Sequence, residues 1–222
     1  MKDWWLLRRE PLGGGQDWLY TIFSRSDGIL RVSCVNRTDD ERRLPDLHQR
    51  CRGDWQSTRE FPRLKAPEVT GSLELAGNNL ICALYLDELL LTILPLSEPA
   101  PELFDLYSTT LSELNKGQRA DVWLRLFEQR LLSHCGSGIN WSEDTNGDAI
   151  DAARTYEFES GGGFIFAADD TQGWPGQILL AIADGDLRFP GALTAARNIL
   201  RQAIDFAASR PLISRELLIN ST

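Results

Sequence analysis

The chain lacks the paired cysteines that hold metals or form disulfides. Its four cysteines are scattered singly, at Cys34, Cys51, Cys82 and Cys135. No two of them have the spacing of a metal clip, and 222 residues are enough to bury a core without covalent staples. This pattern is typical of reducing compartments, so we expect a cytoplasmic protein without disulfides.

Residues that carry catalysis are also scarce. There are two histidines, His48 and His134, and neither stands in a recognisable arrangement with a serine or cysteine nucleophile. The acidic groups at 169–170 and 184–186 lack the spacing of a calcium loop, and the triple glycines lack the lysine of a phosphate loop. We therefore expect a protein that is not an enzyme and holds no cofactor.

The longest apolar run, from Asn78 to Pro95, is too short to span a membrane. A span needs about 20 apolar residues with few charges, whereas Asp87 and Glu88 interrupt this run and Pro95 ends it. Because its leucines leave no polar stripe, we expect a helix that is buried on nearly all sides. The N-terminus lacks the long apolar block of a signal peptide, and we expect no targeting segment.

Negative charge is concentrated in the second part of the chain. Residues 1–78 hold 13 Lys+Arg and 12 Asp+Glu, a net charge of +1. Residues 79–222 hold 10 Lys+Arg and 20 Asp+Glu, a net charge of −10. A phosphate-binding surface is therefore expected on the N-terminal part.

The first 77 residues have the two-residue period of β-strands. Residues 18–23 and 29–35 alternate on either side of a Ser26-Asp27-Gly28 turn, which predicts a hairpin. A polar, arginine-rich loop is expected at 36–59, followed by strands at 60–65 and 68–75. About five short strands favour a small closed barrel of the OB type over an open sheet with bare edges.

After Gly77 the spacing of apolar residues becomes helical. We expect a bundle of three helices over 78–95, 101–116 and 119–135, with short links between them. An irregular acidic segment and a β-hairpin are expected at about 140–168, then a short helix at 177–183 and a long one after Pro190-Gly191. The predicted class is α+β, with an OB-fold domain at 1–77 and a helical domain at 78–222.

Candidate DNA-binding residues lie between Arg25 and Lys65, where ten basic residues face seven acids. A single strand binds an OB groove through cations that replace counterions and aromatic rings that stack on bases. The candidate cations are Arg31, Arg37, Arg42, Arg43, Arg50, Arg52, Arg63 and Lys65, with Trp55 and Phe61 nearby. The alternative is a solvated polar loop whose arginines pair with neighbouring acids.

Six stretches, in order along the chain, carry a resemblance to a known family. They are the N-terminal hairpin, 84–90 (LYLDELL), 101–104 (PELF), 125–128 (RLFE), 161–164 (GGGF) and 214–218 (SRELL). In these stretches the chain resembles the bacterial DNA repair and recombination mediator RecO. The resemblance implies an OB fold, a helical bundle and, in some members, a small element with a four-cysteine zinc site.

The same resemblance implies a function without bond chemistry. Members bind single-stranded DNA, anneal complementary strands and, with RecR, load recombinase on DNA coated by single-stranded-DNA-binding protein. The implied location is the cytoplasm, with nucleoid association during repair.

The resemblance also implies a docking site for the C-terminal tail of the coating protein. Beside Leu124, Arg125 matches the family arginine that holds the tail's terminal carboxylate, with Arg130 as the alternative one turn later. From the residues alone, Arg125 also suits a helix-surface salt bridge with Asp121 or Glu128.

Two features depart from the family pattern. Where zinc-bearing relatives have paired cysteines, this chain has only carboxylates, at Glu143, Asp144, Asp148 and Asp151, so we expect no zinc. The acids at 39–41 interrupt the basic run after the third strand, which leaves open a RecO-like adaptor that works only through partner proteins.

Arg197 and Arg201 stand four residues apart on the last long helix. They are either a solvated pair or a contact for a phosphate or an acidic partner.

Overall fold

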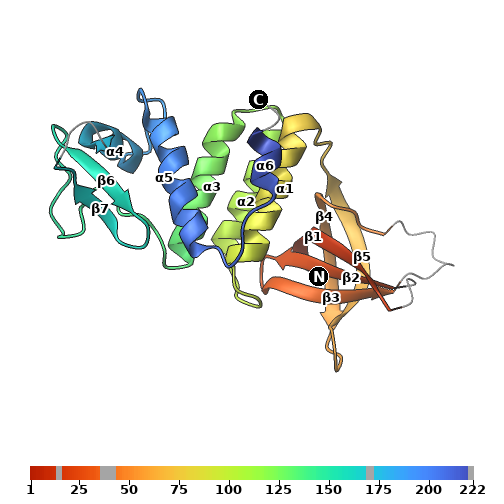
Figure 1. The fold of residues 1–222 in the computed structure, drawn as a ribbon. Coiled ribbons are helices and arrows are strands. Elements are labelled where there is room, and N and C mark those ends of the chain that lie inside the picture. The colour runs from red at the N-terminus through yellow and green to blue at the C-terminus, as the bar shows by residue number, and fades with distance from the viewer. Residues whose placement is uncertain (14–16, 36–43, 169–172, 220–222) are drawn as a thin grey trace. The chain divides into compact units, whose positions relative to one another are not determined.

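The computed structural model describes residues 1–13, 17–35, 44–168 and 173–219 (Figure 1). The residues group into two compact units, and each is described by itself. Unit 1 comprises Met1–Gln118 and Leu212–Thr222, and unit 2 comprises Arg119–Pro211. The domain boundary between residues 77 and 78 stays a prediction.

Unit 1 begins with a five-stranded closed barrel. Its strands are β1 (Lys2–Leu12), β2 (Asp17–Ser24), β3 (Gly28–Val35), β4 (Gln49–Gln56) and β5 (Arg63–Ser72). They follow the order β1-β2-β3-β5-β4, and β4 pairs with β1 to close the barrel. All pairings are antiparallel except that of β3 with β5. The OB-like barrel and the α+β class predicted from the sequence are confirmed.

The barrel interior is filled by alternate side chains of the strands. These come from all five strands: Trp4, Leu6, Tyr20, Ile22, Val32, Cys34, Cys51 and Leu64. The residues between them point outward, so their surroundings decide whether they are buried or exposed.

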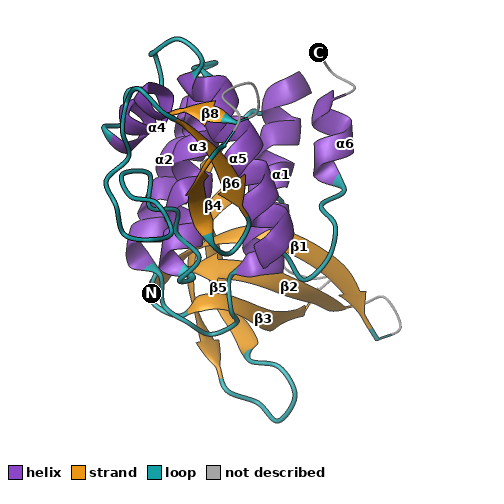
Figure 2. Cartoon of the chain, turned by 60° about the vertical axis from the view of Figure 1, so that its left-hand side comes forward, coloured by secondary structure: helices purple, strands orange, loops and turns teal. Residues whose placement is uncertain are grey.

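Helices cover one part of this outer surface. Unit 1 contains α1 (Gly77–Ile93), α2 (Pro101–Asn115) and α6 (Ser214–Ile219). In Figure 1 and Figure 2, α1 stands beside the strands of the barrel. Phe23 of β2 packs edge-on against Phe104 and Tyr107 of α2, with ring centroids 5.4 and 6.0 Å apart. Trp5 of β1 donates its indole N–H to the Ser108 hydroxyl at 2.8 Å.

The turn between β2 and β3 fits closely against the link from α1 to α2. The backbone N–H of Ser97 donates to the carbonyl oxygen of Ile29 at 2.9 Å. A Cβ atom on Gly28 would lie 2.0 Å from the carbonyl oxygen of Glu98. Gly28 also has a φ of +70°, so this position requires glycine on both counts.

A buried polar cluster connects the entry to β4 with both long helices. The carboxylate of Asp87 on α1 lies 3.0 Å from Nε2 of His48 and accepts a hydrogen bond from the Tyr107 hydroxyl. Burial raises the pKa of the Asp87 carboxyl, and the hydrogen bonds from His48 and Tyr107 partly offset that shift. Because the polar groups of the cluster are hydrogen-bonded to one another, His48 is held in a fixed position.

The short helix α6 is held against α1 by a carboxylate. Glu88 accepts hydrogen bonds from the backbone N–H groups of Ile213 and Ser214 at 3.0 and 2.9 Å, and another from the Ser214 hydroxyl. A carboxylate at the start of a helix satisfies N–H groups that have no partner within the helix. The Glu88 of the LYLDELL stretch thus contacts the SRELL stretch 126 residues later.

Unit 2 combines helices with a small sheet. Its elements are α3 (Ala120–His134), β6 (Thr155–Glu159), β7 (Gly163–Phe166), β8 (Trp174–Pro175), α4 (Gly176–Ala183) and α5 (Ala192–Ala207). The strand order is β7-β6-β8, and α5 packs against α3 and α4. Trp141 and Phe158 pack against Phe164, with ring centroids 5.6 and 5.4 Å apart. This aromatic cluster forms the core of the segment that contains the small sheet.

Most predicted elements agree with the structure, but the last two barrel strands differ. The sequence analysis places residues 49–56 in a loop, whereas they form β4, and it divides β5 into two strands. The alternate charged residues on β4 are also typical of a loop, although Cys51 between them lies in the barrel core and Trp55 packs against it. In the part of the chain that the structure describes, no helix is long and apolar enough to cross a membrane.

Candidate nucleic-acid interface

Arg31 and Arg63 lie on the same outer face of β3 and β5. Arg31 precedes the core residue Val32, so its side chain points away from the interior. Ser33, two residues further along β3, pairs with Arg63 of β5. The Arg31 guanidinium lies 5.2 Å over the centre of the Phe61 ring. Sequence reasoning named these residues, and the structure brings them together.

Lys65 extends this face by one more outward position on β5. We name Arg31, Phe61, Arg63 and Lys65 the β3–β5 patch. Within the described ranges, Arg63 and Lys65 form no ion pair, and both are exposed. Their positive charge is thus available to an incoming phosphate.

Arg8, which is not among the cations predicted from the sequence, borders this patch. Arg8 of β1 and Arg31 of β3 both pair with Thr21 of β2, from opposite sides. Glu10 lies 2.9 Å from Arg8 and 3.9 Å from Arg31. One carboxylate therefore serves two arginines and leaves a net charge of +1 there. Arg8 lies before the arginine-rich segment 25–65, and its place in the alternating pattern of β1 is the signal in the sequence that points to it.

Arg50 and Arg52 lie on another part of the barrel surface and share an acid. Both are on β4, and Asp3 of β1 is the strand partner of Arg52. Asp3 lies 2.8 Å from Arg52 and 3.6 Å from Arg50. We name these three residues the β1–β4 patch. Surface pairs of this kind contribute about 0–1 kcal/mol to stability, but they lower the local positive charge.

Two further cations lie over half-buried tryptophan rings of the barrel. Lys2 is 4.5 Å from the ring centre of Trp55, and Arg9 is 5.4 Å from that of Trp18. Asp46 lies 3.5 Å from Arg9. A cation next to an aromatic face combines the two groups that single-strand binding uses, one for phosphate and one for stacking.

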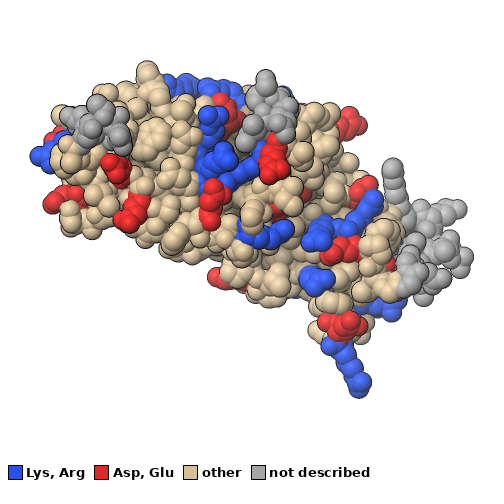
Figure 3. Space-filling view, viewed as in Figure 1, with Lys and Arg blue, Asp and Glu red and all other residues tan. Residues whose placement is uncertain are grey.

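The remaining predicted cations of the barrel lie outside the described residues. These are Arg37, Arg42 and Arg43, together with the acids Asp39, Asp40 and Glu41. The view in Figure 3 shows blue and red atoms interspersed over the described part of the barrel, so this face is mixed in charge.

Arg125 on α3 is buried rather than set on the rim of a groove. It forms a 2.6 Å salt bridge with Glu128, and the two side chains are 10% and 1% exposed. Its Nε atom is buried without a hydrogen-bond partner among the described residues. Leu124 beside it is also buried, whereas Arg130 one turn later is exposed. The role of these three residues in binding a partner's tail stays a prediction.

Two carboxylates of the acidic segment, Asp144 and Asp151, stabilise its turns. Asp144 accepts hydrogen bonds from the backbone N–H groups of Asn146 and Asp148 at 2.8 and 3.0 Å. Asp151 accepts one from Ala153 at 2.9 Å. Such side-chain bonds to the backbone stabilise tight turns. On α5 of the same unit, Arg197 and Arg201 are both exposed, as a solvated pair would be.

The sequence of the chain is similar to those of known proteins. The family described as "Recombination protein O C terminal" matches residues 75–173. DNA repair protein RecO of Pseudomonas aeruginosa (strain LESB58) is 37% identical over 170 residues, which cover 75% of this chain and 73% of that protein. DNA repair protein RecO of Pseudoalteromonas translucida (strain TAC 125) is 37% identical over 226 residues, which cover 98% and 96%.

The similarity to the second relative extends over nearly the full length of both chains, barrel included. Such similarity supports a role in DNA repair and recombination. The chain belongs to the RecO family of DNA repair proteins.

Proposed function

We propose that the barrel binds single-stranded DNA through the β3–β5 patch. The observation that carries this proposal is the cluster of Arg31, Arg63 and Lys65 beside the Phe61 ring. The cations are suited to displace counterions from phosphates, and the ring is suited to stack on a base. Every base has a flat face, so this mode of binding reads little sequence.

The proposed result of binding is the annealing of complementary strands. Two strands whose phosphates are partly neutralised repel each other less, so they pair faster without nucleotide hydrolysis. Mixing two complementary oligonucleotides at low salt, with and without the protein, tests this step. An unchanged rate of duplex formation contradicts it.

Direct binding is measured by fluorescence anisotropy of a labelled single strand at two salt concentrations. The affinity should fall steeply as salt rises, because most of the contacts proposed are to phosphates. A Phe61→Leu variant removes the aromatic ring and keeps the charge. Base stacking on an aromatic side chain contributes about 1–3 kcal/mol, so this variant should bind more weakly at both salt concentrations.

The second candidate function is a protein-only adaptor with weak or no DNA binding. Asp3 and Glu10 favour it, because each carboxylate faces two arginines of the barrel. If anisotropy stays unchanged with single-stranded DNA at low salt, the adaptor is the better account. The partners would then carry the entire interaction.

For either function we propose two protein partners, RecR and the C-terminal tail of single-stranded-DNA-binding protein. In this scheme the chain and RecR together load recombinase on DNA coated by single-stranded-DNA-binding protein. A mixture of the chain with RecR should elute earlier from a sizing column than either protein alone. Unchanged elution volumes contradict that partnership.

The tail is proposed to bind α3 near Leu124, with Arg130 as the exposed cation and Arg125 behind it. A carboxylate tail needs one cation beside an apolar surface. Arg125 is already paired with Glu128, so Arg130→Glu should weaken binding of an acidic tail peptide at least as much as Arg125→Gln does. A urea unfolding curve for each variant separates lost binding from lost folding. If neither variant binds the peptide more weakly, the tail site lies elsewhere.

A further inference from the structure

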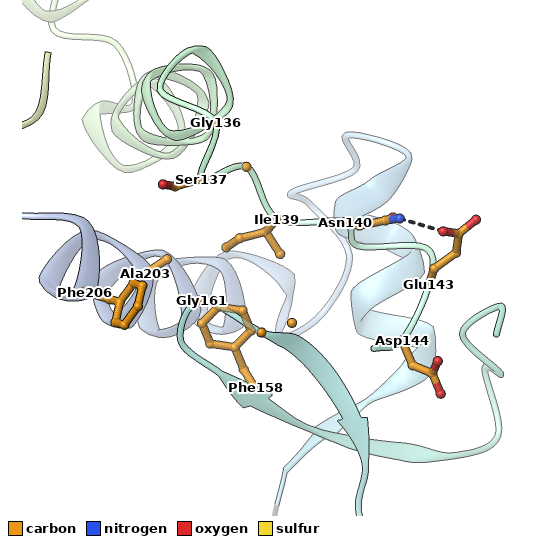
Figure 4. Close-up of a pocket in the computed structure, with 13 residues that line it drawn as sticks. Gly136, Ser137, Ile139, Asn140, Glu143, Asp144, Phe158, Gly161, Ala203 and Phe206 are labelled. Atoms are coloured by element: carbon orange, nitrogen blue, oxygen red, sulfur yellow. Dashed lines mark hydrogen bonds between the residues drawn. The ribbon is translucent and has the colours of Figure 1, made fainter. Parts of the chain in front are cut away.

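Unit 2 has a pocket whose lining includes neither Arg125 nor any residue of the barrel patches. Its cavity of about 280 Å³ is lined by the residues that follow α3, the turn between β6 and β7, and the last turns of α5 (Figure 4). Phe158 and Phe206 supply aromatic walls, and Glu143 and Asp144 supply carboxylates. The pocket is therefore apolar on one side and acidic on the other.

The electrostatics of the pocket favour a cation. Gly136 lines it two residues after the end of α3, and Phe206 lines it from the last turn of α5. The negative ends of two helix dipoles are thus close to the cavity. Residues 136–168 hold six acids and one arginine, a net charge of −5. Asn140 donates one hydrogen bond to Glu143 at 2.9 Å, which leaves the negative charge of that carboxylate in place.

The aromatic side of the pocket is open to solvent. Phe206 is 66% exposed, an unusual degree for a large apolar side chain on a helix that is otherwise well packed. A Cβ atom on Gly161 would lie 2.6 Å from the Phe206 ring, so glycine lets the hairpin backbone approach the ring closely. An exposed aromatic face next to carboxylates is suited to contact a cation and its apolar stem.

We propose that this pocket binds an arginine or lysine side chain from a basic segment of a partner protein. The stem of such a side chain would lie along Phe158 and Phe206, and its charged head would face Glu143 and Asp144. Charge complementarity identifies the occupant, since nucleic-acid phosphates would be repelled by the same carboxylates. An acidic tail would be repelled for the same reason, so this surface is distinct from the proposed tail site on α3.

The test uses the full chain and two synthetic pentapeptides. One is Ac-Gly-Leu-Arg-Leu-Gly amide, and the other carries citrulline in place of arginine, which keeps the shape and removes the charge. Amide NMR signals of Gly136, Gly161 and Gly162 report binding at the pocket itself. We expect saturable shifts of these signals with the arginine peptide and about tenfold weaker binding of the citrulline peptide.

Glu143→Gln is the informative variant because it removes one charge and keeps the side-chain shape. Glu157→Gln is the matched control, since Glu157 is exposed on β6 outside the pocket lining. Glu143→Gln should weaken binding of the arginine peptide several-fold, whereas Glu157→Gln should leave it within twofold. Equal binding of the two peptides, equal effects of the two variants, or shifts confined to other residues would overturn the proposal.

Discussion

The outer surface of the barrel has a covered part and an open part, and the same strands contribute to both. On β3, Ile29 points outward under the link between α1 and α2 and is fully buried, whereas Arg31 two residues later points outward and is exposed. On β1 and β2, Trp5 and Phe23 are buried against α2. An outward residue therefore becomes core or binding surface according to what covers it.

Carboxylates are unevenly distributed over the open part, so its two cationic patches differ. In the β1–β4 patch, Asp3 faces both arginines at 2.8 and 3.6 Å. In the β3–β5 patch, Arg63 and Lys65 have no ion-pair partner among the described residues. The cations of the two patches are thus neutralised to different degrees, so the two patches should differ in their effect on DNA binding.

The covered part should respond most strongly to mutation. Phe23→Ala removes a fully buried ring from its contacts with Phe104 and Tyr107 and leaves a cavity. We expect the free energy of unfolding to fall by about 3–5 kcal/mol. A urea unfolding curve measures it. If the loss is below about 1 kcal/mol, the contact between barrel and α2 is not part of the core.

On the open part, charge reversal should separate the two patches. Arg31→Glu with Arg63→Glu should weaken single-strand binding by roughly 100-fold at low salt, because two charge-assisted bonds of about 1.5 kcal/mol each are lost. The slope of log K against log salt should become smaller by about 1.4, at about 0.7 per phosphate contact. Arg50→Glu with Arg52→Glu is the matched control. Equal losses from the two double variants would show that the patches do not differ.

The sequence predicts the fold better than it predicts this division of the surface. The hairpin at 18–35 and the helices have regularly spaced apolar residues and turn residues at their ends. Such signals depend only on residues that are close together in the sequence. The β4 strand lacks a strong signal because its two core residues, Cys51 and Trp55, are separated by Gly53 and charged residues. The pairing of Asp3 with Arg52 depends on the register of strands that are 49 residues apart, and spacing along the chain does not reveal it.

On α3 too, the sequence predicts local spacing better than it predicts burial. The i,i+3 spacing of Arg125 and Glu128 is compatible with a salt bridge between them. That the pair is buried follows from the packing of α3, in which Leu124 and Phe127 are also buried. Helical spacing places a charged residue on a face, but it does not say how wide the buried face is.

The buried polar cluster beneath the covered part gives a pH-dependent prediction. Tyr107→Phe keeps the ring and removes the hydroxyl that donates to Asp87. The pKa of Asp87 is raised in the folded protein, so its contribution to stability is fully present below its ordinary value of 3.8 and decreases as pH rises through the folded-state pKa. Loss of the Tyr107 donor should raise that pKa further.

We therefore expect Tyr107→Phe to lower the free energy of unfolding by about 1–3 kcal/mol at neutral pH and by less near pH 4. Urea unfolding at the two pH values measures the difference. In an Asp87→Asn background the pH dependence of the substitution should disappear. A loss that is the same at both pH values would mean that the hydroxyl does not stabilise the carboxylate.

The smallest effect is expected where a carboxylate of the open part is neutralised. Asp3→Asn releases Arg50 and Arg52 from their shared partner, so the β1–β4 patch should come to resemble the β3–β5 patch. Because exposed ion pairs contribute at most about 1 kcal/mol, single-strand affinity at low salt should rise by about two- to fivefold.

Asp121→Asn is the control for Asp3→Asn, since it also removes one exposed negative charge and releases one arginine, Arg119, at the start of α3 rather than on the barrel. Anisotropy titrations of both variants with the same labelled strand compare them directly. An equal rise in affinity would mean that DNA responds only to the net charge of the chain. A rise with Asp3→Asn alone would mean that the position of each carboxylate on the barrel controls where the strand binds.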